Sequence, residues 1–469
     1  MPRFVFRASL GPIFLGALAA LAAAQPPAAP AAAPAPDWLT WGGDLRVRNE
    51  YFNGALALNQ TAANHEQDLF RVRLRLWSTA TIAPDWSLNV RLSGEPRFWE
   101  RPAFAKQHPG TGTEWRYAIL DNLNLKWTHA FDLPLTITAG RQDIQIGETL
   151  NWWLTGDGTP GDGSWAFFLD GIRATFDAAD LKTKFDVIGV SQRAKPDAWL
   201  PIAGSPSTYT LVEQNERGLV LYAANQSVPK AQIDGYFIWK QDDAVAATSD
   251  NGDIYTLGAK IAGSPAPNWK YSFEGAWQWG WKQDASVRVP VNLGTLHRDI
   301  RAWAWNARVT YLFKDALDNQ FTILGEYLSG DDPRTQGTDE MFDILWGRWP
   351  RFSELYIYSF PMETSGKIAQ LNNLLRLGAS WSFAPVKGTT VNLACNLWFA
   401  PESVPTRALN AALFSQSGHF RGQFFQAWVK HKFSKSLSGH LWLELVQQGD
   451  FYARRDLLSF LRAELQVTF

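Results

Sequence analysis

Three arginines alternate with apolar residues between Asp68 and Ile82, and this spacing has a direct chemical meaning. Arg71, Arg73 and Arg75 share one parity, and the apolar residues occupy the other (Phe70, Val72, Leu74 and Leu76). Successive side chains of a β-strand point to opposite faces, so the three arginines would share one face. A helix would instead scatter them around its circumference. Because guanidinium groups are planar, permanently charged donors, such a face is suited to carboxylates or phosphates.

Other segments place cations on the polar parity in the same way. The predicted set is Arg46, Arg48, Arg71, Arg73, Arg75, Arg91, Arg97, Lys126, Arg173, Arg308, Arg376 and Arg462. Acids on this parity are fewer, and Glu95 and Glu464 are examples. Any single arginine could either brace the protein through ion pairs or contribute to a path for anions. Around Arg71 the cations outnumber the nearby acids, which favours an anion path.

The alternation recurs along the whole chain, and it predicts strands rather than helices. Segments of about ten or more residues alternate apolar with polar residues, and their connections are alternately short and long, which is typical of a membrane β-barrel. The chain also has 24 Trp, 29 Phe and 12 Tyr with a negative mean hydropathy, as expected where aromatic girdles lie on the outside. We therefore predict an all-β fold, a transmembrane antiparallel β-barrel of about 18 strands. The predicted strands are Trp41–Phe52, Asp68–Ile82, Trp86–Glu100, Tyr117–Phe131, Leu135–Glu148, Ala166–Phe176, Lys182–Arg193, Asn215–Asn225, Ala231–Asp242, Asp253–Ala262, Trp269–Gln283, Ile300–Phe313, Gln320–Leu328, Leu371–Phe383, Thr389–Ala400, Gly422–Phe433, Leu437–Gln448 and Ala453–Phe469.

The two ends of the chain carry signals of their own. Arg3 and Arg7 precede an apolar stretch and the small residues Ala22–Ala24, which predicts a signal peptide over residues 1–24. Residues 25–40 form an Ala/Pro-rich linker, and residues 41–469 form the outer-membrane β-barrel. The last strand is amphipathic and ends in Phe469, which resembles the assembly signal of bacterial outer-membrane proteins. The expected localisation is the bacterial outer membrane.

Composition excludes several other classes of protein. The 44 Lys and Arg residues balance 45 Asp and Glu residues, so a basic nucleic-acid binder is excluded. The single cysteine, Cys395, allows no intramolecular disulfide and no cysteine-based metal site. The seven histidines lie in no recognisable nucleophile motif, and the Gly-rich stretch 157–163 lacks the downstream Glu of a calcium loop. We expect no catalytic residues, no metal and no cofactor, and hence no enzyme.

Aromatic residues also occur on the polar parity, where a lumen would contain them. They are Tyr222, Tyr236, Trp398, Trp428 and Trp442. Two interpretations stay open: these rings could stack against sugars, or they could pack around a loop that folds inward. The connection Gly330–Gln370, with Trp346, Trp349 and Tyr356, is long enough to fold inward as a plug or gate.

Several motifs together resemble the alginate export family of outer-membrane proteins. They are Ala139–Gly147, which contains Gly-Arg-Gln, Phe168–Phe176, which contains Asp-Gly-Ile-Arg, and the segments Gly43–Tyr51 and Phe70–Arg75. The resemblance implies a monomeric 18-strand barrel whose arginine-rich constriction passes an anionic uronate polymer. It also implies that Arg141 and Arg173 contribute to the constriction, with Arg71, Arg73 and Arg75 on the neighbouring wall. Arg141 is in phase with the apolar parity, so it reaches the lumen only through a bulge or at the rim of the strand.

The leading hypothesis is an outer-membrane channel with an arginine-rich lumen that passes anionic polysaccharides or oligosaccharides, such as alginate-like uronates. The alternative in the same class is a general anion-preferring porin for small organic acids. A different class is a receptor or adhesin that acts through its loops. The expected partners are the lipid bilayer and an anionic saccharide or organic anion, with no nucleic acid. We expect a monomer and leave periplasmic export or uptake partners open.

Overall fold

The computed structural model describes residues 38–55, 57–63, 65–101, 112–146, 155–156, 168–195, 212–347, 352–367 and 372–469. The predicted signal peptide, nearly all of the linker, Trp349 and the stretch 157–163 lie outside these residues. Residues 41–469 form a compact unit, and this unit contains the sites below. In the described part of the chain, no helix is both long and apolar enough to cross a membrane.

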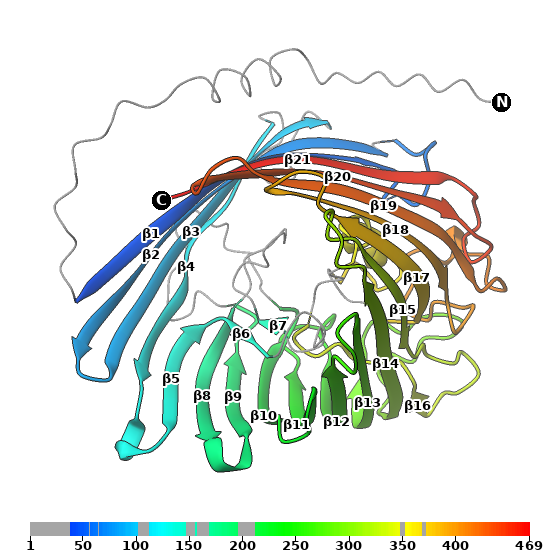
Figure 1. The fold of residues 1–469 in the computed structure, drawn as a ribbon. Helices are drawn as coiled ribbons and strands as arrows, with labels where there is room; N and C mark the ends of the chain where they lie inside the picture. The colour runs from blue at the N-terminus through cyan, green and yellow to red at the C-terminus, as the bar shows by residue number, and fades with distance from the viewer. Residues whose placement is uncertain are drawn as a thin grey trace. The chain divides into compact units, whose positions relative to one another are not determined.

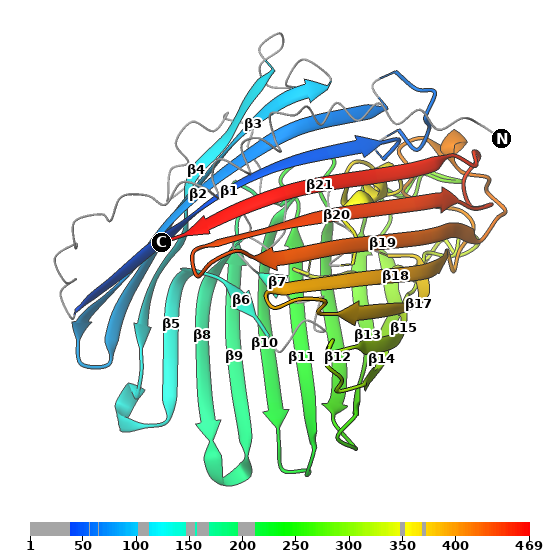
Figure 2. The ribbon, with the colours of Figure 1, turned by 45° about the horizontal axis from the view of Figure 1, so that its top comes forward.

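A single closed sheet of antiparallel strands forms the barrel (Figure 1). Strand β1 pairs with β21, from Asp44 opposite Thr468 to Asn53 opposite Ser459, and this pairing closes the sheet. The first and last strands accordingly lie side by side in Figure 2. Within the described residues 18 long strands form the wall, as predicted. They are β1 (Leu39–Asn53), β2 (Glu66–Ala83), β3 (Trp86–Arg101), β4 (Thr113–Trp127), β5 (Leu135–Gln142), β8 (Leu169–Ala178), β9 (Thr183–Gln192), β10 (Asn215–Asn225), β11 (Ala231–Asp243), β12 (Asn251–Gly263), β13 (Trp269–Gln283), β14 (Arg298–Leu312), β15 (Gln320–Leu328), β17 (Leu374–Phe383), β18 (Thr389–Phe399), β19 (Phe420–Lys432), β20 (Leu437–Gln448) and β21 (Leu457–Thr468).

Short elements lie in the connections between these strands. They are β6 (Ile144–Gln145), β7 (Thr155–Gly156), β16 (Thr338–Asp339), the helix α2 (Leu355–Ser359) and the 3-10 turns at Ala130–Asp132, Ala179–Leu181, Phe360–Met362 and Ala411–Leu413. One of these turns corrects a predicted boundary. Strand β4 ends at Trp127 rather than at Phe131, because His129, Phe131 and Asp132 all adopt positive φ and turn the chain.

The two faces of the wall differ as the sequence alternation requires. On β2, Leu74 and Leu76 are exposed on the outside, whereas Arg71 and Arg73 are buried on the inside. A charge on the lipid face of a barrel costs up to about 2–4 kcal/mol at the bilayer midplane. The arginines therefore face inward, and the exposed apolar side chains form the surface that contacts lipid.

The connections at the two ends of the barrel differ in length, as the sequence predicted. At one end, tight turns join neighbouring strands, and residues with positive φ such as Asp85, Lys230 and Gly388 make these turns. Longer loops occupy the other end, for example between β9 and β10 and between β15 and β17. In outer-membrane barrels the short turns are periplasmic and the long loops are extracellular. We call these the short-turn end and the long-loop end.

The connection between β15 and β17 folds into the barrel. We call residues 329–373 the inner loop; the structure describes them except for 348–351 and 368–371. Its helix α2 lies inside the wall formed by β18, β19 and β20 (Figures 1 and 2). Tyr356 of this helix packs edge-on against Trp398 of β18, with the ring centroids 4.0 Å apart.

Candidate functional site: the arginine-lined wall of the lumen

Seven of the predicted arginines gather where the sheet closes. They are Arg46, Arg48, Arg71, Arg73, Arg75, Arg97 and Arg462, which come from β1, β2, β3 and β21; we call them the arginine cluster. Six of the seven are almost fully buried, and only Arg75 is partly exposed. Residues far apart in the sequence meet here because β21 pairs with β1, which places Glu50 opposite Arg462.

Every arginine of the cluster contacts a carboxylate. Arg71 donates to Glu95 from Nε and Nη2 at 2.9 and 2.7 Å, and to Glu50 at 3.2 Å. Arg462 also donates to Glu50, at 2.9 and 2.6 Å. Among the described residues, seven guanidinium groups share five carboxylates (Asp44, Glu50, Glu95, Glu354 and Glu464). Each arginine of the cluster therefore braces the wall through at least one ion pair, and among the described residues the guanidinium groups outnumber the carboxylates that they contact.

Beside the cluster lies a cavity of about 530 Å³ that is open to the lumen, and we call it the arginine cavity. Three predicted arginines line it: Arg75 of β2, Arg91 of β3 and Arg173 of β8. Most of the other lining groups are amides and hydroxyls (Ser78, Thr79, Asn89, Asn122, Asn124, Thr138 and Gln142). Among the described lining residues, Asp143 is the only acid. The cavity lies toward the short-turn end of these strands.

Carboxylates hold two of the cavity arginines in place, Asp143 from within the cavity lining. Arg91 donates from both terminal nitrogens to Asp143 at 2.7 and 2.8 Å, and from Nε to Asp121 at 2.8 Å. Arg173 donates twice to Asp186, at 2.8 and 2.9 Å. The side chains of Arg91 and Arg173 nevertheless stay 14% and 26% exposed. Arg173, which one carboxylate fixes and which stays partly exposed, can bind a second anion without first being ordered.

Arg141 lies outside this cavity. It is fully buried beneath Phe168, and its guanidinium lies 3.9 Å from the centre of that ring. It donates to Asp170 at 2.9 and 3.2 Å. The preceding Gly140 has φ of 122°, and a Cβ there would lie 2.4 Å from the carbonyl oxygen of Leu123, so only glycine fits. This local change of conformation allows Arg141 to be buried despite its apolar phase, while Gln142 lines the cavity.

The remaining predicted cations are spread around the barrel. Lys126 is exposed near the short-turn end of β4, and Arg308 is half-exposed on β14. Arg376 of β17 is buried, donates to Glu326 at 2.6 Å and lies 4.2 Å from the ring centre of Phe352. The structure therefore brings together the arginines of β1, β2, β3, β8 and β21, but not these three.

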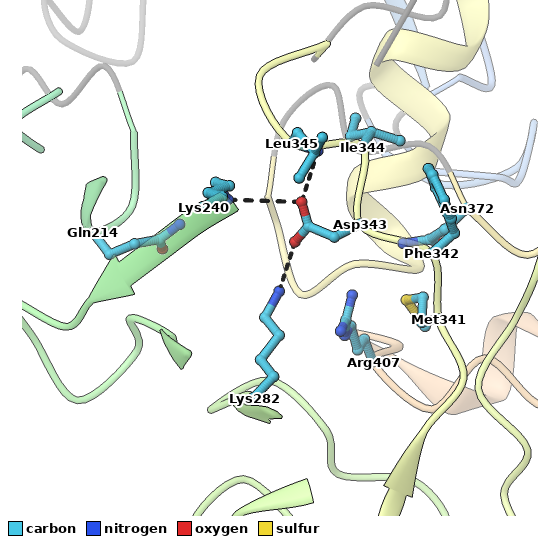
Figure 3. Close-up of a pocket in the computed structure, with 10 residues that line it drawn as sticks. All are labelled: Gln214, Lys240, Lys282, Met341, Phe342, Asp343, Ile344, Leu345, Asn372 and Arg407. Atoms are coloured by element: carbon cyan, nitrogen blue, oxygen red, sulfur yellow. Dashed lines mark hydrogen bonds and ion pairs between the residues drawn. The ribbon is translucent and has the colours of Figure 1, made fainter. Parts of the chain in front are cut away.

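A second charged network, centred on Asp343 of the inner loop, was not predicted. Its carboxylate lies 3.7 Å from Nζ of Lys240 and 3.0 Å from Nζ of Lys282 (Figure 3). The adjoining cavity holds only about 10 Å³, roughly the space of one water molecule. Burial opposes the ionisation of Asp343, but attraction by the two lysines outweighs it, so its pKa lies below the ordinary value. The polar parity places Lys240 inside, whereas nothing in the sequence around Asp343 indicates its partners.

The inner loop is also attached to the opposite part of the wall. Glu444 of β20 accepts hydrogen bonds from Ser353 Oγ at 2.7 Å and from the backbone N–H groups of Glu354 and Leu355 at 3.1 and 2.9 Å. The side chain of Glu354 pairs with Arg462 of the arginine cluster at 2.8 Å. On the other side, Trp346 packs so closely on Gly218 of β10 that a Cβ there would lie 2.2 Å from the indole. The loop therefore reaches from β10 to β20 across the lumen.

Comparison with known proteins agrees with this architecture. The family model for alginate export matches residues 37–459. The solved structure of OccAB1 from Acinetobacter baumannii is similar with a TM-score of 0.57 at 10% sequence identity, covering 92% of this chain and 96% of that one. OccAB2 from the same organism has a TM-score of 0.55 at 9% identity, covering 92% and 98% of the two chains. A BenF-like porin from Pseudomonas fluorescens Pf-5 has a TM-score of 0.53 at 10% identity, covering 92% and 99%.

These structural likenesses concern the fold alone, and no curated protein matches the sequence. The family match extends over nearly all of the barrel, including the strands that form the arginine cluster and the arginine cavity. The chain belongs to the alginate export family, and it is a channel of the bacterial outer membrane rather than an enzyme.

Proposed function

We propose that this channel passes anionic saccharides, alginate-like uronate chains in particular, across the outer membrane. The arginine cavity carries the proposal. It presents three guanidinium groups together with amides and hydroxyls, and its volume falls within the range of about 300–1,000 Å³ that is common for small-ligand sites. A uronate residue has one carboxylate and several hydroxyl groups, which match these donors and acceptors.

The electrostatics of the neighbouring wall favour anions in the same way. The arginine cluster holds two more guanidinium groups than carboxylates among the described residues, and it adjoins the cavity through Arg75. Low-dielectric walls with an excess of one charge raise the local concentration of ligands of the opposite charge. Anions that enter at the short-turn end would therefore meet an attractive field.

A second candidate function is an anion-preferring porin for small organic acids. The inner loop favours it, because its attachments to β10 and β20 narrow the path through the barrel. A narrow path admits a small carboxylate more easily than a polymer. The arginine cavity itself would bind either kind of anion.

Single-channel recording in a planar bilayer tests the proposal. A salt gradient first gives the ion selectivity, and an oligo-uronate and a neutral glucan of equal length are then added in turn. We expect anion selectivity and block by the oligo-uronate only. Cation selectivity would overturn the proposal, and passage of small organic acids without block by the oligo-uronate would favour the second candidate.

A substitution in the cavity refines this experiment. Arg173→Gln removes a partly exposed guanidinium, and we expect it to weaken block by the oligo-uronate about tenfold, which corresponds to one charge-assisted hydrogen-bonded contact. Arg101→Gln is the matched control, because Arg101 is exposed near the long-loop end and pairs there with Glu66. Equal block in both variants would remove the arginine cavity from the path.

A further inference from the structure

We propose that Trp428, Lys430 and Trp442 form a second saccharide subsite, which stacks against a pyranose ring while it binds the carboxylate of that ring. This inference rests on the proposed function and adds a selectivity for cyclic sugar acids over acyclic organic acids. We call the three residues the aromatic platform.

The three side chains come together through strand pairing. Trp428 of β19 lies directly opposite Trp442 of β20, and their ring centroids are 6.4 Å apart. Nζ of Lys430 lies 4.9 Å from the ring centre of Trp428 and 5.6 Å from that of Trp442. Their parity is the inward one, because the intervening Val429 is exposed on the outer face. Two indoles and one ammonium group therefore share a patch of the inner wall.

Other residues hold Trp442 of the platform in place. The indole N–H of Trp442 donates to Glu444 at 2.9 Å. Glu444 in turn accepts hydrogen bonds from the backbone N–H groups of Glu354 and Leu355, at the start of the helix α2. The guanidinium of Arg462 lies 5.8 Å from the ring centre of Trp442 on its other side. Such fixation lowers the entropy that a ligand must lose on binding, because the ring does not need to be ordered.

The inner loop covers one part of this wall and leaves Trp428 and Lys430 accessible, whereas Trp442 is buried beside them. Trp398 of β18 has no exposed surface, because Tyr356 and Phe352 of the loop pack against it. Trp428 is only partly buried, and Lys430, two residues before the end of β19, is exposed. Of the two roles that the sequence left open for inward aromatic residues, Trp398 has the packing role. Trp428, with Nζ of Lys430 over its ring, keeps exposed surface for the stacking role.

The chemistry of the platform fits a sugar acid. The face of an indole is electron-rich and apolar, so it attracts the C–H groups on the flat side of a pyranose ring. An ammonium group beside the ring can at the same time pair with the carboxylate of the sugar, as the nearby Lys430 allows. An acyclic organic acid has the carboxylate but lacks the rigid C–H face. The platform therefore favours the saccharide over the small anion.

The platform and the arginine cavity lie along the same wall. Only β21 and β1 separate β20 from β2 in the closed sheet. Both sites lie toward the short-turn end of their strands. Two neighbouring sites for one repeating ligand bind more tightly than either alone, because the second contact is made within the same complex.

The test compares Trp428→Ala, Trp428→Phe and Lys430→Gln with wild type in single-channel recordings. Trp303→Ala is the matched control, because Trp303 lies on the outer face. We expect Trp428→Ala to shorten the residence time of an oligo-uronate in the pore about tenfold and Trp428→Phe to keep most of it. Lys430→Gln should shorten it too, whereas Trp303→Ala should not. Block by gluconate, an acyclic sugar acid, should be the same in Trp428→Ala and wild type.

The outcomes separate the two proposals. An unchanged residence time in Trp428→Ala, with wild type still blocked by the oligo-uronate, overturns the platform and leaves the proposed function standing. Equal loss of gluconate and oligo-uronate block in Trp428→Ala also overturns it, because the ring would then only shape the pore. If the oligo-uronate does not block wild type at all, the proposed function fails and the platform fails with it.

Discussion

Arg71 and Arg173 both face inward from strands of the same wall, yet their surroundings give them different properties. Arg71 is fully buried and its donors are divided between Glu50 and Glu95. Among the residues that the structure describes, Arg173 pairs only with Asp186, and it remains 26% exposed beside an open cavity. Residue type and strand parity are the same in both cases. The two arginines differ in how much of the guanidinium stays exposed: a fully buried one holds the wall together, whereas a partly exposed one can meet a ligand.

Removal of Arg71 should have the largest effect, and the effect should be on stability. Arg71→Met leaves Glu50 and Glu95 buried with fewer cationic partners, and breaking a buried ion pair from one side costs about 3–5 kcal/mol. We expect the folded barrel to convert to the unfolded form at a clearly lower temperature, measured as the shift in gel mobility on heating. The double variant Arg71→Met/Glu95→Gln should recover part of this loss. An Arg71→Met barrel that is as stable as wild type would contradict the bracing role.

Arg173→Gln should cost much less stability than Arg71→Met. Asp186 keeps the hydroxyl of Thr175 as a donor, and a partly exposed pair contributes about 0–1 kcal/mol. Heating followed by the same gel assay should therefore give a transition close to that of wild type, while oligo-uronate block falls. If Arg173→Gln destabilised the barrel as strongly as Arg71→Met, the distinction between the two groups of arginines would disappear.

The ion pairs of Asp343 with two lysines are a third kind of charged contact, because they join the inner loop to the wall. Asp343→Asn removes the charge that faces Lys240 and Lys282, and loss of a buried charged partner costs about 1–3 kcal/mol. Lys240 keeps Asp242 at 2.9 Å and Lys282 keeps Asp250 at 3.3 Å, so the barrel itself should remain folded. We expect a higher single-channel conductance, because the loop is held less firmly on this side. An unchanged conductance would mean that the contacts of Trp346 and Glu444 hold the loop without Asp343.

Strand parity made the wall predictable because lipid requires an apolar side chain at every second position. The bounds of β10, β13, β15 and β20 are the predicted ones to the residue. The inward face of each arginine of the cluster was predictable for the same reason, since a charge that cannot face lipid must face inward. To the pairing of neighbouring strands, closure of the sheet adds the pairing of the first strand, β1, with the last strand, β21, and every closed barrel requires such a pairing.

Contacts between the wall and its loops could not be predicted in this way. Asp343 meets Lys282 across 61 residues of sequence, and no periodicity links the two. The burial of Arg141 depends on the positive φ of Gly140, which the sequence shows only as one glycine among 36. The acids that hold Arg91 and Arg173 come from neighbouring strands, and their identity depends on register. Periodicity predicts the face on which a side chain lies, whereas its partners follow from register and loop packing.

Lowering the pH from 7 to 4.5 should have the smallest effect of the changes considered, and the effect is measured on the conductance. Because burial is outweighed by attraction to Lys240 and Lys282, the pKa of Asp343 is lowered in the folded protein. A lowered pKa contributes stability above the pKa of an unfolded aspartate, about 3.9, and this contribution is lost only as pH falls through the lowered value. Between pH 7 and pH 4.5 the carboxylate therefore stays ionised and the loop stays attached. Conductance of wild type should be the same at the two pH values and should stay below that of Asp343→Asn. A rise at pH 4.5 to the level of the variant would show that the pKa of Asp343 is raised rather than lowered.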